Sequence, residues 1–103
     1  MSDIITIRDV QKYKSSVKRI NYLCKNIPWF AYACMSTVRV QDEYFMYVAA
    51  ACFYETIHFL DKLNKYMFMS VNELKYDEKI RILNMICMCN KINALRWILS
   101  KIN

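Results

Sequence analysis

The sequence has no glycine and a single proline, Pro28, among its 103 residues. β-Hairpin turns need residues with positive φ, and glycine supplies most of them. P-loops and dinucleotide-binding folds need glycine so that the backbone can approach a phosphate. The composition therefore excludes β-sandwiches, β-barrels and glycine-dependent nucleotide folds. It favours helices joined by short loops, in which asparagine can replace glycine at helix ends.

Acidic residues are few: nine, against fifteen basic ones, which gives a net charge of +6. A positive chain suits nucleic acid or an acidic protein surface as partner but requires neither. The basic residues are densest near the start of the chain. The candidate anion-binding residues there are Lys12, Lys14, Lys18 and Arg19. A solvated helix face is the alternative interpretation.

The chain also lacks the features of a secreted or membrane protein. Its five cysteines are an odd number without regular spacing, which argues against a disulfide framework. The first nine residues carry Asp3, Arg8 and Asp9 and do not resemble a signal peptide. No apolar run is long enough to span a bilayer. We therefore expect a cytoplasmic or nuclear protein with reduced thiols and no membrane partner.

Apolar residues make up 56% of the chain and aromatic residues 15%, enough for one compact core in a small domain. We predict an all-α fold, a single domain over residues 1–103 built as a bundle of about five helices. Residues 1–9 are expected to form an extended lead-in or a short strand, because residues 3–8 alternate as D-I-I-T-I-R.

The spacing of apolar residues predicts a first helix over residues 10–25, capped by Asp9 and ended by Pro28. A short apolar run follows at 29–35, whose structure the periodicity does not decide. Residues 41–65 read as two helices joined by a tight bend near Tyr54 and Glu55, with one long helix as the alternative.

Two further helices are expected in the last third of the chain. One begins at Asp77, which acts as its cap, and Asn90 and Asn93 interrupt it. The other is short and runs from Ala94 to Ile102.

Catalytic and metal-binding patterns are missing. His58 is the only histidine, and no Ser-His-Asp or Cys-His grouping surrounds it. Zinc needs about four paired ligands, whereas Cys87 and Cys89 are two apart and diverge on a helix. The carboxylate pairs fall at expected helix starts, where they suit the helix dipole. We therefore predict neither enzyme activity nor a cofactor.

A dense group of aromatic, aliphatic and methionine side chains in the middle of the chain is the candidate partner-binding surface. Its members are Phe53, Tyr54, Ile57, Phe59, Tyr66, Met67, Phe68 and Met69. Core packing is the alternative interpretation. Self-association is also plausible, because so many apolar side chains exceed what one helix pair covers.

Residues 50–61, A-A-C-F-Y-E-T-I-H-F-L-D, resemble a recurring segment of the BTB/POZ superfamily, which includes the Skp-type adaptors and elongin C. The Ala50-Ala51 pair, Phe53, Glu55 and the Phe59-Leu60-Asp61 ending carry the likeness. Residues 5–10, 17–24 and 77–81 fit the same register, but the hairpin-rich N-terminal sheet of that superfamily is missing.

The resemblance implies an adaptor whose helical region, residues 50–81, binds F-box-type or other host proteins. The missing sheet puts cullin binding and BTB-type dimerisation in doubt. The wealth of Ile, Lys, Asn and Tyr is typical of A/T-rich genomes, including those of large DNA viruses and some parasites. A truncated adaptor or viral decoy that acts on ubiquitin-ligase or signalling machinery would fit these features.

A second resemblance is to ankyrin-like helical hairpins of viral proteins. Residues 45–60 and 83–98 align at a constant offset of 38, with Ile57 over Leu95 and Phe59 over Trp97. The ankyrin turn signature and its glycines are missing. The first hypothesis is therefore a non-catalytic protein-interaction module, and the alternatives are a nucleic-acid-binding helical domain or an ankyrin-like repeat protein.

Overall fold

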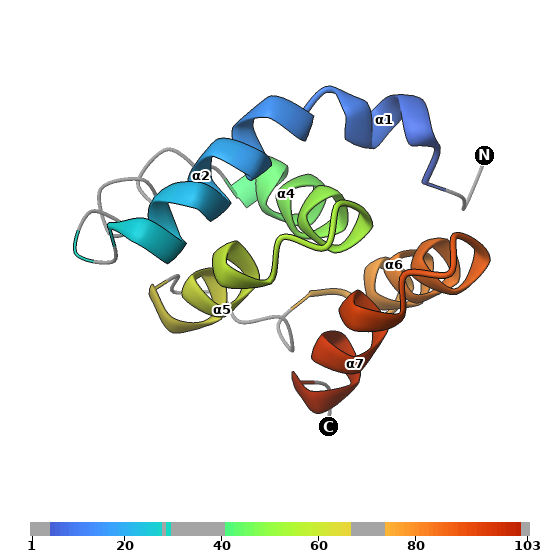
Figure 1. Ribbon diagram of the computed structural model, residues 1–103. Helices are drawn as coiled ribbons and strands as arrows, with labels where there is room; N and C mark the ends of the chain where they lie inside the picture. Colours follow the sequence, from blue (N-terminus) through green and yellow to red (C-terminus); the bar gives the residue numbers. More distant parts are fainter. Residues whose placement is uncertain (1–4, 28, 30–40, 67–73, 102–103) are drawn as a thin grey trace.

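The computed structural model describes residues 5–27, 29, 41–66 and 74–101, which contain six α-helices and no strand (Figure 1). In chain order the helices are α1 (Ile7–Gln11), α2 (Lys14–Asn26), α4 (Gln41–Phe53), α5 (Ile57–Tyr66), α6 (Tyr76–Met88) and α7 (Ile92–Lys101). The predicted all-α fold is confirmed, with six described helices rather than about five. The apolar run at 29–35 lies outside the described residues except for Trp29, which is exposed.

The start of the chain corrects two predictions. The expected short strand is wrong for its described part, because Ile7 and Arg8 already belong to α1. Asp9 is not the N-cap: Thr6 is, in an extended conformation, and its Oγ1 accepts the Asp9 backbone N–H at 3.2 Å. The Asp9 carboxylate in turn accepts the Thr6 N–H at 3.1 Å, which completes a capping box.

The first predicted helix, residues 10–25, is two helices in the structure. Between them the Tyr13 N–H donates to the Val10 carbonyl, which is three residues back and not four as in an α-helix, so the backbone makes a tighter turn there. The Tyr13 ring packs edge-on against Tyr47 of α4, with centroids 4.9 Å apart. The break therefore points an aromatic side chain into the core.

The predicted bend near Tyr54 and Glu55 is confirmed, and it recurs. Each boundary of α6 and α7 lies 35 residues after the matching boundary of α4 and α5. The residues with positive φ, Glu55 at 53° and Asn90 at 56°, are also 35 apart. The alignment at an offset of 38 is therefore wrong, because the helix boundaries set the repeat at 35.

Both bends are Schellman motifs, a helix ending in which two backbone N–H groups bond back to the last turn. In the first, Thr56 donates to the Ala51 carbonyl and Glu55 to that of Cys52. In the second, Lys91 donates to the Ile86 carbonyl and Asn90 to that of Cys87. Glycine usually occupies the left-handed position, and in this glycine-free chain Glu55 and Asn90 take its place.

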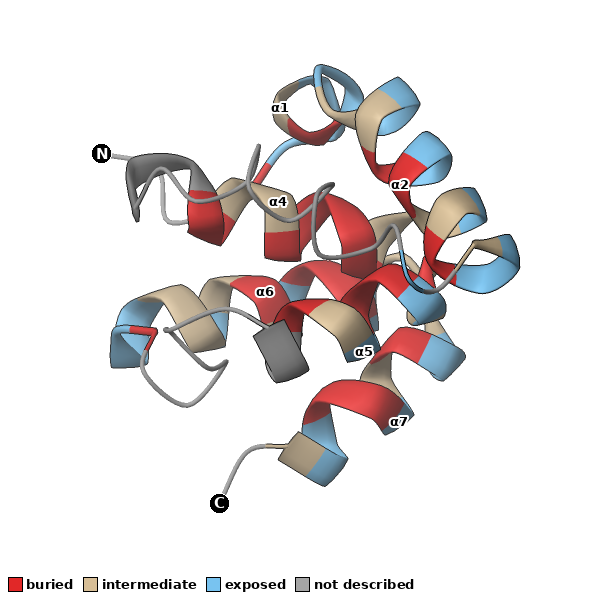
Figure 2. Ribbon diagram, turned by 90° about the vertical axis from the view of Figure 1, so that its left-hand side faces the viewer, coloured by how far each residue is buried: buried red, intermediate tan, exposed pale blue. Residues whose placement is uncertain are grey.

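The helices stack as successive pairs. Figure 2 shows α1, α4 and α6 following one another down the molecule, and α1 contacts α4 while α4 contacts α6. In the same way α2 packs on α5, and α5 on α7. The molecule therefore has two layers, formed by the first and the second helices of three consecutive pairs.

The core lies where the layers meet, and α4 runs through its middle. As its all-round apolar sequence predicts, α4 is buried from Val48 to Cys52 without interruption. Among the described residues the largest completely buried side chains include Phe59, Leu60 and Ile86. The Cα radius of gyration, 12.6 Å, matches the value of about 13 Å for a compact domain of 100 residues.

Candidate functional site

The two predicted surfaces, one basic and one aromatic, meet at the bend between α4 and α5. The ammonium groups of Lys14 and Lys18, one turn apart on α2, lie 5.8 Å and 5.7 Å from the ring centroid of Tyr54. These distances are within the range of cation–π attraction, about 6 Å. The sequence gives no reason to join these groups, which the packing of α2 against α5 brings together.

A third cation comes from the next helical pair. The Lys91 ammonium lies 4.8 Å from the ring centroid of Phe53. Phe53 and Tyr54 contact each other edge-to-face, with centroids 4.9 Å apart. We call the five residues Lys14, Lys18, Phe53, Tyr54 and Lys91 the cation–aromatic surface, since two half-buried rings lie between lysines contributed by the neighbouring pairs.

The backbone under this surface is fixed by links between the pairs. The Glu55 carboxylate accepts the backbone N–H groups of Asn93 and Ala94 at 3.0 Å and 3.3 Å, at the start of α7. The Asn21 side-chain oxygen accepts the Phe59 N–H at 3.0 Å, at the start of α5. Phe59 and Ala94 are both the third residue of their helix, so each pair caps the second helix of the next.

A second contact joins α5 to α7 at their middles. The Trp97 indole N–H donates to the Asp61 carboxylate at 2.7 Å. A charge-assisted bond of this length is stronger than one between neutral groups. The two bends that contribute Tyr54 and Lys91 to the cation–aromatic surface are therefore held in register.

The Tyr54 phenol adds no negative charge to this surface. Partial burial raises the pKa of the Tyr54 phenol, so the ring stays neutral at physiological pH. Each lysine ammonium has three N–H donors, and a ring face engages the charge without accepting them all. The surface can therefore offer both apolar ring edges and donors for carboxylate or phosphate oxygens.

The candidate partner-binding residues divide into three groups. Phe53, Tyr54 and Ile57 are half-buried at the bend and remain accessible. Phe59 is 0% exposed, so its assignment to a binding surface is corrected: it is core, packed edge-on against Tyr47. Tyr66 ends α5, and Met67, Phe68 and Met69 lie outside the described residues.

The candidate anion-binding residues also separate. Lys14 and Lys18 join the cation–aromatic surface. Lys12 lies in the turn after α1, where its charge and above all the hydrogen bonds from Thr6 lower the pKa of Asp9. Arg19 is exposed on α2. The basic start of the chain is therefore not one uniform stripe.

The remaining reactive side chains do not gather. His58 is exposed at the start of α5, and Cys52 is completely buried, which raises the pKa of its thiol to about 12. Within the described ranges no three His, Cys, Asp or Glu side chains are placed to hold a metal ion. Within the same residues no helix has the length and apolarity that a membrane span requires.

No protein-family model, curated protein or solved structure matches this chain.

Lys91 is the residue of the cation–aromatic surface that sequence reasoning missed. It lies 37 positions after Tyr54 in the chain, outside both the basic N-terminal region and the aromatic run. The signal that could have located it is the repeat at an offset of 35, which places Cys87 on Cys52 and Ile92 on Ile57. This register puts the bend after α6, and so Lys91, beside the bend after α4.

Proposed function

We propose that this protein is a non-catalytic module that binds another protein through the cation–aromatic surface, in the cytoplasm or nucleus. The partner presents carboxylates next to apolar side chains. The observation that carries the proposal is the convergence of Lys14, Lys18 and Lys91 on the adjoining rings of Phe53 and Tyr54.

The arrangement has the anatomy of a small protein-binding site. Aromatic side chains supply much of the binding energy of protein interfaces, at the centre of the contact. Charged residues around them steer an oppositely charged partner and raise its association rate. Phe53 and Tyr54 form such a centre, and the three lysines surround it.

A nucleic acid is the second candidate, because lysines beside aromatic rings can also bind phosphates and stack bases. The geometry favours a protein, since both rings are half-buried and contact each other edge-on. Their faces are turned toward lysines of this chain, which leaves less ring face for a base. A nucleic-acid complex would weaken steeply as the salt concentration rises.

The two family resemblances lead to different partners. The recurrence of helix lengths, bends and hydrogen bonds at 35 residues supports an ankyrin-like helical-repeat protein. The BTB/Skp-like resemblance of residues 50–81 stays a prediction. It would make the protein a truncated adaptor or viral decoy for F-box-type or signalling proteins.

Affinity capture with matched charge reversals tests the proposal. Tagged wild-type chain, a Lys14→Glu/Lys18→Glu variant and an Arg19→Glu/Lys25→Glu variant are incubated with lysate, and bound proteins are quantified by mass spectrometry. All four positions are exposed on α2, and the two double variants carry the same net charge. Only the first pair lies over Tyr54.

We expect a stoichiometric protein partner that the Lys14→Glu/Lys18→Glu variant loses by about tenfold or more and the control variant retains. Equal losses with both variants would mean that net charge, not this surface, binds the partner. Capture of nucleic acid alone, abolished by moderate salt, would favour the second candidate. No stoichiometric partner under mild conditions would overturn the proposal.

A further inference from the structure

The outer side of the last helical pair is apolar and open. It carries two stripes with helical spacing, which we call the α6–α7 face. Its residues are Ile80, Leu83 and Cys87 on α6 and Ile92, Leu95 and Leu99 on α7. Ile80 is 37% exposed, and Ile92 and Leu99 are each 57% exposed.

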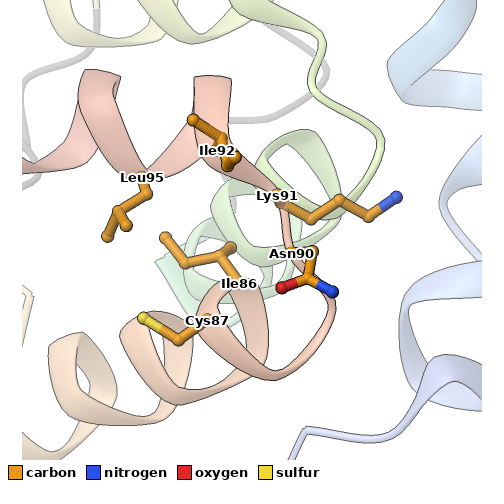
Figure 3. Close-up of a pocket in the computed structure, with 6 residues that line it drawn as sticks. All are labelled: Ile86, Cys87, Asn90, Lys91, Ile92 and Leu95. Atoms are coloured by element: carbon orange, nitrogen blue, oxygen red, sulfur yellow. The ribbon is translucent and has the colours of Figure 1, made fainter.

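A hollow of about 160 Å³ lies in this face, near the bend between the two helices (Figure 3). Cys87, Ile92 and Leu95 form its wall with the buried Ile86. Asn90 and Lys91 lie at its edge. A concave apolar site with polar groups at one side is the usual form of a groove that receives a side chain.

The preceding helical pair carries the equivalent positions on α4, and there they are covered. Counting back 35 residues from Ile80, Leu83 and Cys87 gives Phe45, Val48 and Cys52 of α4, which are 9%, 0% and 0% exposed. Helix α6 packs against α4 and covers Phe45, since the Arg81 guanidinium carbon lies 5.0 Å from the Phe45 ring centroid. The matching positions on α6 have no helix over them among the described residues. These α6 positions are therefore expected to pack against a further helix.

The two ends of the stack differ in this respect. In helical-repeat proteins the terminal units carry a polar outer face, which keeps the end of the stack soluble. The first pair exposes Gln11, Ser15 and Arg19 together with the apolar Ile7 and Tyr22. The last pair differs in that its outer stripes are aliphatic along both helices.

Charge identifies the kind of helix that fits. Residues 76–101 contain five basic and two acidic side chains. Arg96 is exposed on α7 between the positions of Ile92 and Leu99, and Lys91 lies at the edge of the hollow. Of the two acids, Glu78 accepts the Lys75 N–H at 2.9 Å. A second copy of this chain would bring the same positive excess to the contact, whereas flanking carboxylates would be complementary.

We propose that the α6–α7 face binds an amphipathic helix of another protein, whose apolar stripe is flanked by carboxylates. The helix lies along the groove between α6 and α7 with one side chain in the hollow. Lys91, at the edge of the hollow, also belongs to the cation–aromatic surface, but the α6–α7 face shares no residue with that surface and its occupation does not depend on it.

The test uses a fluorescent helical peptide of about 18 residues, long enough to cover both stripes. It carries leucines on one face and glutamates beside them, and a second peptide has lysine in place of each glutamate. Binding to the full chain is followed by fluorescence anisotropy near physiological salt. Ile92→Asp is the test variant and Ile7→Asp its matched control, because both isoleucines begin a helix and are 57% and 54% exposed.

We expect the acidic peptide to bind at least about tenfold more tightly than the basic one. Ile92→Asp should weaken this binding by about tenfold or more, while Ile7→Asp and Lys14→Glu/Lys18→Glu leave it within about twofold. The last variant separates failure of this inference from failure of the proposed function.

Equal affinity for the two peptides, or no binding, would overturn the inference. So would a loss with Ile7→Asp that equals the loss with Ile92→Asp. Light scattering that shows a wild-type dimer and an Ile92→Asp monomer would also overturn it, since the occupant would then be a second copy.

Discussion

Glu55 and Asn90 have nearly the same left-handed backbone conformation, with φ of 53° and 56°, at matching places in two successive helical pairs. The left-handed conformation costs the two residues different amounts of free energy. Asparagine tolerates this conformation, whereas a longer side chain such as glutamate loses about 1 kcal/mol or more in it. The Glu55 carboxylate offsets that cost by capping α7.

Substitutions at Asn90 test the left-handed bend. Asn90→Gly should keep or raise the free energy of unfolding by up to about 1 kcal/mol, because glycine adopts positive φ without strain. Asn90→Ala should lower it by about 1 kcal/mol, since alanine is strained there. Urea denaturation followed by circular dichroism measures both. A more stable alanine variant would contradict the bend geometry.

Substitutions at Glu55 test the link between the pairs. Glu55→Ala keeps a side chain that is strained at positive φ but removes the acceptor for the α7 backbone, so we expect a loss of about 1 kcal/mol. Glu55→Gln keeps an acceptor oxygen and should lose less. Hydrogen exchange of the Asn93 and Ala94 amides locates the effect. Unchanged exchange in the alanine variant would show that the cap has no energetic role.

Phe53 and Phe59 test the division between surface and core. Phe59→Ala should cost about 3–5 kcal/mol, because the ring is completely buried. Phe53→Ala should cost about 1 kcal/mol, since the ring is only half-buried. If Phe59→Ala does not fold, Phe59→Leu serves instead, with an expected loss of about 1.5 kcal/mol. A greater loss at Phe53 than at Phe59 would reverse the assignment.

The cysteines differ in reactivity with pH. Only the thiolate reacts with iodoacetamide, and a pKa of about 12 leaves about one Cys52 thiol in ten thousand ionised at pH 8. We expect Cys87, which is exposed, to be alkylated at least about a hundredfold faster than Cys52 in the native protein. Urea should remove the difference. Peptide mass spectrometry measures each site, and rapid native labelling of Cys52 would contradict its burial.

Local patterns in the sequence predicted the elements whose causes are local. The run of residues 45–52 is apolar on all sides, which is typical of a buried helix, and a shift in the apolar pattern around residues 53–56 indicates the bend. The start of the chain was misread because the pattern D-I-I-T-I-R of residues 3–8 resembles a strand, while the Thr6 and Asp9 pair is a capping box.

Tertiary packing decided the features that the sequence alone did not predict. The burial of Phe59 depends on the packing of α5 against α2 and α4, and the Phe59 ring contacts Tyr47 of α4. The cation–aromatic surface depends on three helical pairs being in register. Neither can be predicted before the 35-residue repeat and the stacking of the pairs are known.

Crosslinking mass spectrometry in native lysate tests the proposed binding surface most directly. A lysine-reactive crosslinker reports which of the ten lysines lie near the partner. The proposed function predicts that one partner crosslinks to Lys14, Lys18 and Lys91 together, while Lys25 at the far end of α2 does not react with it. A partner crosslinked mainly to Lys25 or Lys75, with none of the three lysines involved, would contradict it.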